Sequence, residues 1–280
     1  MECLICLYKI LIIYRYINMT DLSVYPVKSL DIFDDAKDLD PRLPEITRNH
    51  GSSILIVGPT GSGKSSIINN LLLNKHMWGR TKQRPRGCFD QVVIFSPSIY
   101  LDDTSRFLAD SFDCYDTFDG KILEGLKQSQ LELEKDKRNR LCIVVDDSVG
   151  LDVLKSKSAY TYWNTRYRHM NANLITSIQN YKAANTIMRN NSNCVILMYG
   201  IYNVNELQKL QDELGDIFRG TLLYCYKKFC REKYSFLTLY PRRVPAVMML
   251  NFDEEINYKQ YQAEAKNFKV ENYESDEDSD

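Results

Sequence analysis

The sequence lacks the features of a zinc-binding, secreted or membrane-spanning chain. Only one Cys-x-x-Cys pair is present, Cys3 with Cys6, and no second pair follows at the spacing of a zinc finger. The first 17 residues are apolar, but Lys9 and Arg15 interrupt them, no basic segment precedes them, and no small-residue cleavage site follows. We therefore expect no zinc site, no signal peptide and no stable insertion into a membrane.

The cysteines indicate a reducing compartment. Several of them lie in or beside apolar runs, where a reduced thiol behaves as a small hydrophobic side chain. These are Cys88, Cys114, Cys142, Cys194 and Cys225.

The net charge is divided unevenly along the chain. The whole sequence carries a formal charge of -1, but its last ten residues hold six acids and no bases, which leaves +5 on the rest. A mildly basic body permits a polyanionic partner without requiring one.

Length and hydrophobic content favour one main domain. With 280 residues and 44% hydrophobic content, the chain can bury the core of one α/β domain and has little room for a second. The expected parts are an apolar N-terminal extension (1–19), a lead-in segment (20–50), the α/β domain (51–250) and a C-terminal helix with an acidic disordered tail (251–280). The extension either lies upstream of a true start at Met19 or packs on the core, and a membrane-surface anchor is the minor alternative.

Apolar runs alternate with longer amphipathic windows from Ser52 onward, which indicates βα units and a mainly parallel central sheet flanked by helices. Strands are predicted at 53–57, 91–95, 141–145, 173–178 and 193–198, with a closing pair near 221–227 and 233–239. Helices are predicted at 64–75, 121–137, 152–169, 182–190 and 203–214.

The stretch ILIVGPTGSGKSSIINNLL, residues 54–72, places an apolar strand, a glycine-rich turn and a helix in direct succession. Glycines allow turns that point backbone N–H groups inward, and the N-terminus of the helix adds partial positive charge. This P-loop pattern in its required context predicts a nucleotide site, in which Lys64 reaches the β- and γ-phosphates and Ser65 ligates Mg²⁺. The predicted nucleotide-binding residues are Gly58, Pro59, Thr60, Gly61, Ser62, Gly63, Lys64, Ser65 and Ser66.

Two aspartates follow an apolar strand in LCIVVDDSVG, residues 141–150. A carboxylate at the end of a buried strand beside the P-loop strand can hold Mg²⁺ or its water, and we assign this role to Asp146. Asp147 stands where many ATPases carry a glutamate that polarises the attacking water. The alternative is that Asp147 only caps the following turn.

Gln179 ends the predicted inner strand in NANLITSIQNY, where an amide could sense the γ-phosphate and orient water. The alternative is an ordinary strand-end glutamine. Arg166, Arg168 and Arg189 each precede an apolar strand, and a guanidinium supplied by a neighbouring subunit can stabilise the transition state by roughly 10³ to 10⁵ in rate. A surface salt bridge is the alternative role for each arginine.

Several classes of nucleotide-binding protein do not fit. No Asn-Lys-x-Asp motif reads a guanine base, and no Leu-Ser-Gly-Gly-Gln signature marks a transporter ATPase. Residues 115–140 resemble one long charged helix rather than the arginine-rich lid of a small nucleoside kinase. An oligomeric motor or a switch ATPase remains.

The ordered set of motifs resembles the genome-packaging ATPases of poxviruses and other nucleocytoplasmic large DNA viruses, within the FtsK/HerA superfamily. The resemblance spans roughly residues 50–245 and adds QVVIFSPS, RYRHMNANLITSIQNY, IMRNNSNCVILM and KYSFLTLYPRRVP to the motifs above. It implies a P-loop NTPase of the RecA/FtsK-like fold with ATP and Mg²⁺ as cofactors. Carried over by position, Asp146 would hold the metal, Asp147 would serve as base, Gln179 as sensor, and either Arg168 or Arg189 as the arginine acting in trans.

The resemblance also implies an ATPase that works as a homo-oligomeric ring, moves double-stranded DNA into a capsid and contacts other virion assembly proteins. Such a chain would act at the assembly site in the cytoplasm of an infected cell, with the virion as a second location, and would not be secreted. A nucleotide-dependent switch or assembly ATPase acting on a protein partner is the alternative, and a small-molecule kinase fits less well.

A DNA channel needs positive charge directed at phosphates. The segment GRTKQRPRG places Arg80, Lys82, Arg84 and Arg86 within seven residues and is the candidate channel loop. A solvated surface loop is its alternative, and the pair at residues 242–243 is a weaker candidate.

Overall fold

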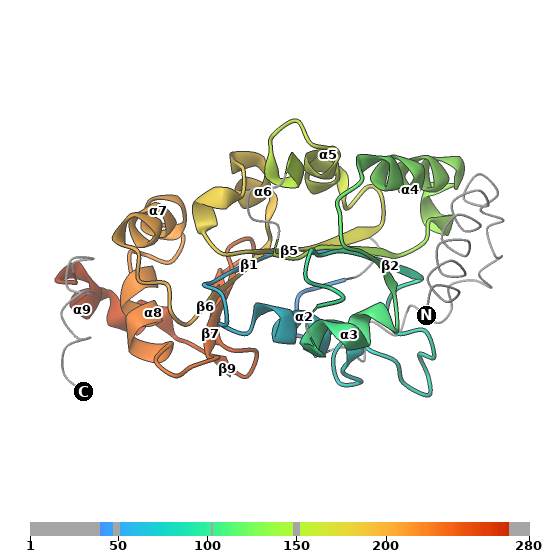
Figure 1. The fold of residues 1–280 in the computed structure, drawn as a ribbon. Helices are drawn as coiled ribbons and strands as arrows, with labels where there is room; N and C mark the ends of the chain where they lie inside the picture. Colours follow the sequence, from blue (N-terminus) through green and yellow to red (C-terminus); the bar gives the residue numbers. More distant parts are fainter. Residues whose placement is uncertain (1–39, 47–50, 102, 148–151, 269–280) are drawn as a thin grey trace.

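The computed structural model describes residues 40–46, 51–101, 103–147 and 152–268, and these residues form one nine-stranded sheet with helices on both faces (Figure 1). Segments rich in Val, Ile and Leu become central strands because helices cover both of their faces. In chain order the strands are β1 (Ser53–Val57), β2 (Gln91–Phe95), β3 (Asp113–Tyr115), β4 (Leu141–Val145), β5 (Ala172–Ile178), β6 (Cys194–Met198), β7 (Phe236–Tyr240), β8 (Val247–Leu250) and β9 (Glu254–Glu255).

The strand order places the P-loop strand between two parallel neighbours. The order is β3-β2-β4-β5-β1-β6-β7-β8-β9, with parallel pairing from β3 to β6 and antiparallel pairing from β6 to β9. Ser53 of β1 lies opposite Leu174 of β5, and Ile54 lies opposite Cys194 of β6. Because parallel strands end at the same edge of a sheet, the segments that follow β1, β4 and β5 meet there.

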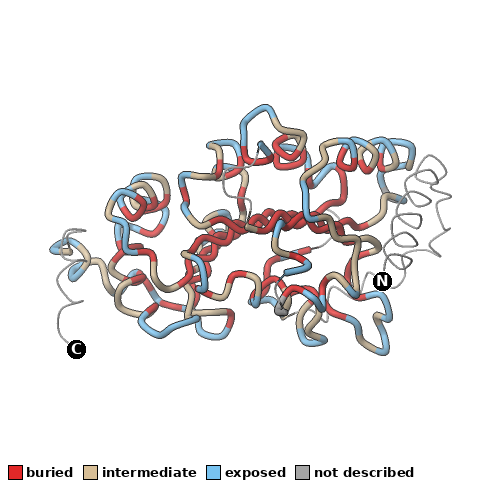
Figure 2. Tube along the Cα trace, in the orientation of Figure 1, coloured by how far each residue is buried: buried red, intermediate tan, exposed pale blue. Residues whose placement is uncertain are grey.

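The helices form two layers around the sheet (Figure 1). One layer contains α4 (Gly120–Glu132), α5 (Ala159–Arg166), α6 (Thr186–Asn191) and α7 (Val204–Leu214), and the other contains α2 (Lys64–Leu73) and α3 (Asp103–Ala109). Leu123 and Trp163 pack in the core of the first layer, whereas Ile68 packs with Ile54 in the core of the second. Figure 2 shows the central strands buried between these layers.

Most of the predicted central elements are confirmed. The strands predicted at 53–57, 91–95, 141–145, 173–178 and 193–198 correspond to β1, β2, β4, β5 and β6. The helices predicted at 121–137 and 152–169 are shorter than expected. The chain becomes extended at Leu133 after α4, and α5 begins only after Ser158, whose side chain accepts a hydrogen bond from the backbone N–H of Thr161.

The strand predicted at 221–227 is wrong, because this segment is helix α8 (Leu222–Phe229). Leu222, Cys225 and Tyr226 are buried, at the spacing of one face of a helix. A short apolar run does not by itself distinguish a buried strand from a buried helix. The closing antiparallel pair is instead β7, which was predicted, and β8, which was not; β3 and α3 were also not anticipated.

The chain ends are only partly described. The N-terminal extension, the Cys3–Cys6 pair and the tail beyond residue 268 lie outside the described residues. At the end of the lead-in segment, Leu43 and Ile46 are buried in the core on the α2 side. The expected domain boundaries remain predictions, and the sheet itself continues past residue 250 to β9. Within residues 40–46, 51–101, 103–147 and 152–268, no helix is long and apolar enough to cross a membrane.

Candidate active site

The P-loop turns from the end of β1 into the start of α2. The N–H of Gly58 donates to the carbonyl of Ile178 at 3.1 Å, which ties the loop to β5. Gly61 and Gly63 have φ angles of 77° and 97°, a left-handed conformation that residues with a side chain rarely adopt. The loop therefore reaches the N-terminus of α2, where unpaired backbone N–H groups favour an anion.

The loop residues divide into an inner and an outer set. Ser62 and Lys64 are buried, whereas Thr60, Gly61 and Ser66 are exposed at the rim. The backbone N–H of Ser62 donates to the carbonyl of Pro59 at 3.3 Å and closes the turn.

Lys64 points back across the loop. Its Nζ donates to the carbonyl oxygens of Gly58 at 2.8 Å and Pro59 at 2.9 Å. Burial lowers the pKa of Lys64, while the charges of Asp146 and Asp147 act in the opposite direction. The ammonium group therefore donates to two neutral carbonyl groups, and a charged phosphate oxygen could replace them as its acceptor.

Asp146 lies beside the P-loop serine. Ser65 Oγ donates to Asp146 Oδ2 at 3.2 Å, and the N–H of Asp146 donates to the carbonyl of Phe95 at 2.9 Å. Burial raises the pKa of Asp146, whose side chain sits at the end of β4. A hydroxyl and a carboxylate side by side are hard oxygen donors, so this pair fits Mg²⁺.

Asp147 and Gln179 meet across neighbouring strand ends. Gln179 Nε2 donates to Asp147 Oδ1 at 3.0 Å, although the two residues follow different strands, β4 and β5. Asp147 has a φ of 46°, a left-handed conformation that aspartate tolerates better than most residues. The site therefore holds a second carboxylate and an amide beside the P-loop. Their roles as base and sensor remain predictions.

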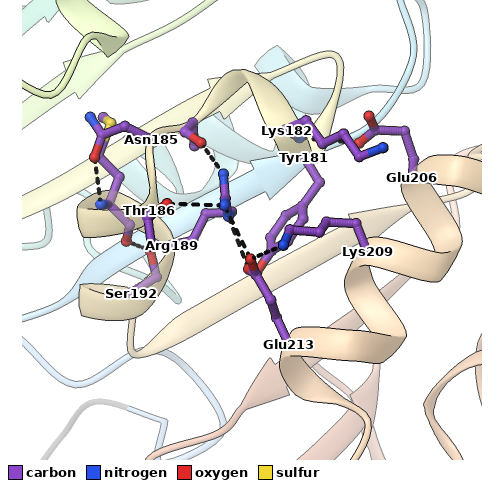
Figure 3. A network of polar contacts seen from close by, with 11 residues as sticks. Tyr181, Lys182, Asn185, Thr186, Arg189, Ser192, Glu206, Lys209 and Glu213 are labelled. Carbon is purple, nitrogen blue, oxygen red and sulfur yellow. Dashed lines mark hydrogen bonds and ion pairs between the residues drawn. The ribbon is translucent and has the colours of Figure 1, made fainter.

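Arg189 is held inside its own subunit. Its guanidinium donates to both carboxylate oxygens of Glu213, at 2.9 Å and 3.1 Å, and its side chain is only 8% exposed (Figure 3). Tyr181 and Lys209 also contact Glu213. Burial alone would raise the pKa of Glu213, but the hydrogen bonds from Arg189, Lys209 and Tyr181 outweigh it and lower the pKa. This arrangement fits the alternative role of Arg189 as a structural ion pair, and its role in trans stays a prediction.

Replacing Arg189 by methionine should destabilise the fold. The change leaves the half-buried Glu213 carboxylate without its bidentate partner, so we expect a loss of about 2 kcal/mol in the free energy of unfolding. Thermal unfolding followed by circular dichroism measures this loss. Arg166→Met is the matched control, since Arg166 is exposed and its guanidinium stacks on the Tyr162 ring. An Arg189→Met variant that kept its melting temperature but lost ATP hydrolysis would instead support a role in trans.

Arg166 and Arg168 are exposed near the end of α5, where the chain turns into β5. Arg168 lines a hollow of about 170 Å³ together with Arg242 and Arg243, near the starts of β1 and β6. The P-loop lies at the opposite edge of the sheet, so Arg168 could contact a nucleotide only in another subunit. Arg243 is partly engaged, because it donates to the carbonyl of Pro41 at 3.0 Å.

The predicted channel loop has three exposed basic side chains and one arginine, Arg84, that is bonded within the loop. Arg80, Lys82 and Arg86 are exposed, whereas the guanidinium of Arg84 donates to Cys88 Sγ at 2.6 Å and to the carbonyl of Met77 at 3.4 Å. Arg84 therefore fixes the shape of the loop, and the other three side chains are available to a polyanion. The loop joins α2 to β2 and thus lies at the edge opposite the P-loop.

Two features near the site were missed by the sequence analysis. Tyr234 lies against the P-loop, where a Cβ on Gly63 would be 3.1 Å from its Cδ1 atom. On α7, Glu206 accepts a hydrogen bond at 3.1 Å from the backbone N–H of Lys182, so α7 supports the turn that follows Gln179 (Figure 3). Glu206 belongs to no motif, and Tyr234 lies in KYSFLTLYPRRVP, to which the sequence assigned a closing strand and no role at the nucleotide site. Both residues reach the site from distant parts of the chain.

Comparison with known proteins supports the fold. No protein-family model and no curated protein matches the sequence. Among solved structures, the genome packaging NTPase B204 from Sulfolobus turreted icosahedral virus 2 matches in complex with AMPPCP, with 16% identity, a TM-score of 0.51, and coverage of 72% of this chain and 97% of that one. Its complex with AMP gives 18% identity, a TM-score of 0.50, and coverage of 72% and 96%.

B204, the DNA-packaging ATPase from Sulfolobus Turreted Icosahedral Virus, gives 16% identity, a TM-score of 0.50, and coverage of 71% of this chain and 95% of that one. The expected resemblance to genome-packaging ATPases is thus confirmed at the level of the fold. This chain is an α/β protein with the P-loop NTPase fold that these viral packaging enzymes share.

Proposed function

We propose that the chain hydrolyses ATP and uses the energy to move double-stranded DNA into a capsid during virion assembly. The observation that carries this proposal is the convergence of the P-loop with two strand ends: Ser65 contacts Asp146, and Gln179 contacts Asp147. The shared fold supports it, since B204 is a genome packaging NTPase that was solved in complex with AMPPCP.

The proposed reaction is attack of water on the γ-phosphorus, with cleavage of the bond to the bridging oxygen and release of ADP and phosphate. Asp147 accepts the proton of the water, and Gln179, held by its hydrogen bond to Asp147, orients that water. Lys64 stabilises the charge that develops on the phosphate oxygens. Ser65 and Asp146 would hold Mg²⁺, which when bound supplies further positive charge to the β- and γ-phosphates.

A packaging motor also needs a second subunit and a DNA surface. We propose a homo-oligomeric ring in which Arg168 of one subunit reaches the nucleotide of the next, and in which Arg80, Lys82 and Arg86 contact DNA phosphates. Capsid or other assembly proteins are the further partners. The proposed place of action is the assembly site in the cytoplasm of an infected cell, with the virion as the second location.

The test is steady-state ATP hydrolysis by the purified chain, measured with and without long double-stranded DNA. We expect DNA to raise the rate severalfold and rising salt to abolish the increase, because phosphate contacts release counterions. Hydrolysis at full rate without DNA would count against the translocase, and slow hydrolysis unchanged by DNA, combined with nucleotide-gated binding to a protein, would select the switch ATPase instead.

Charge removal tests the DNA surface. The triple variant Arg80→Ala, Lys82→Ala, Arg86→Ala should weaken DNA binding and DNA stimulation while basal hydrolysis stays unchanged. The control removes the same charge from three exposed lysines on other elements, Lys121, Lys259 and Lys266. Equal weakening in both triple variants would mean that DNA responds to net charge and not to this loop.

A further inference from the structure

We propose that Tyr234 is the platform on which the base of the bound nucleotide stacks. The inference rests on the proposed function, because it requires a nucleotide at the P-loop. It adds a contact for the base, which the P-loop itself does not read.

The fold brings Tyr234 to the nucleotide edge of the sheet. Tyr234 lies in the short connection between α8 and β7, and β7 runs antiparallel to β6, so β7 begins where β6 ends. The backbone N–H of Tyr199 donates to the carbonyl of Ser235 at 2.9 Å and joins the two strand ends. A Cβ on Gly63 would lie 3.1 Å from Tyr234 Cδ1 and 3.7 Å from Met198 Cε. The ring therefore borders the part of the P-loop that opens α2.

Tyr234 is exposed and has an unusual backbone. Its side chain lies on the surface, with 56% of the residue exposed, and its φ is 72°, which is rare for a bulky aromatic residue. The next residue fixes this turn, since the N–H of Ser235 donates to the carbonyl of Glu232 at 2.9 Å. A strained backbone that directs an aromatic ring toward solvent beside a phosphate site has no use in core packing and suits a binding role.

The chemistry of the ligand fits this position. The α-phosphate of a P-loop nucleotide lies near the start of the helix, and the ribose and base extend beyond it along the surface. An aromatic ring at that point can stack on the π-face of any base, so it adds affinity without choosing between adenine and guanine. Lys233 lies over the Tyr234 ring, with Nζ 5.0 Å from the centroid, so the ring already carries a cation–π contact.

A second exposed tyrosine provides a matched comparison. Tyr202 is 42% exposed, but it lies near Gly200, which packs against Pro59 at the opposite end of the P-loop. Tyr202 is therefore not the residue that borders Gly63 at the start of α2. The two tyrosines therefore separate a general loss of surface aromatic area from loss of the proposed platform.

The experiment measures binding of a non-hydrolysable ATP analogue and of inorganic tripolyphosphate by calorimetry. Tyr234→Asn removes the ring but keeps a residue that tolerates positive φ, and we expect its Kd for the analogue to rise about tenfold. Its Kd for tripolyphosphate should not change, because that ligand has no base. Tyr234→Phe and Tyr202→Asn should bind both ligands like the unmodified chain, and Tyr234→Gly repeats the test with the residue that accepts this backbone best.

Three results would overturn the inference: unchanged binding of the analogue by Tyr234→Asn, equal weakening of the analogue and tripolyphosphate, or weakening by Tyr202→Asn alone. Failure of the unmodified chain to bind the analogue would instead remove the proposed function, and the inference with it. The two failures are thus distinguishable in one set of titrations.

Discussion

Replacement of Lys64 by alanine will lower the rate of ATP hydrolysis by on the order of 10²-fold or more, because it removes the one P-loop cation that faces the transferred phosphate. In the structure, Lys64 Nζ is held by the carbonyl groups of Gly58 and Pro59, within the electrostatic reach of Asp146 and Asp147. No other residue of the loop carries a positive charge. The measurement is steady-state hydrolysis at saturating ATP and Mg²⁺, with and without DNA.

Two controls give this result its meaning. Lys121→Ala removes an exposed lysine at the start of α4 and should leave hydrolysis unchanged. Thermal unfolding of Lys64→Ala tests whether the loss reflects chemistry or unfolding, since the variant also loses two hydrogen bonds inside the loop. A folded Lys64→Ala protein that hydrolyses ATP at the normal rate would show that the P-loop is not the site of hydrolysis.

The local part of the site could be predicted from the sequence because its signals are local. The apolar strand, the glycines and the helix of the P-loop are contiguous, so one stretch of sequence contains the whole phosphate-binding segment. Asp147 and Gln179 were each placed at the end of an inner parallel strand, and the structure adds the hydrogen bond that joins them. Strand ends of that kind meet at one edge whatever the order of the outer strands.

The remaining features depend on contacts between distant segments, which a single sequence does not encode in its periodicity. Arg189 could be identified as a candidate, but its partner Glu213 lies on another helix, and only the three-dimensional structure shows the ion pair between them. Helix α8 was mistaken for a strand because its apolar run is short and aromatic. Tyr234 was placed only in a closing strand, and its position beside the P-loop comes from the return of β7 beside β6.

Replacement of Asp147 by asparagine distinguishes its two proposed roles, as the catalytic base or as a cap of the following turn. Asparagine tolerates the φ of 46°, and its Oδ1 can still accept the hydrogen bond from Gln179 Nε2, so the geometry should survive. It cannot accept a proton from water. If Asp147 is the base, hydrolysis falls by roughly 10²- to 10⁴-fold while the Kd for a non-hydrolysable ATP analogue stays unchanged.

A turn-capping role predicts the opposite outcome for Asp147→Asn, because asparagine caps a turn as well as aspartate does. Hydrolysis would then remain near normal, and the base would have to be sought elsewhere. Asp147→Ala completes the comparison, since it removes both the carboxylate and the acceptor for Gln179. Loss of hydrolysis in both variants identifies the carboxylate as essential, whereas loss in the alanine variant alone identifies the hydrogen bond that positions Gln179.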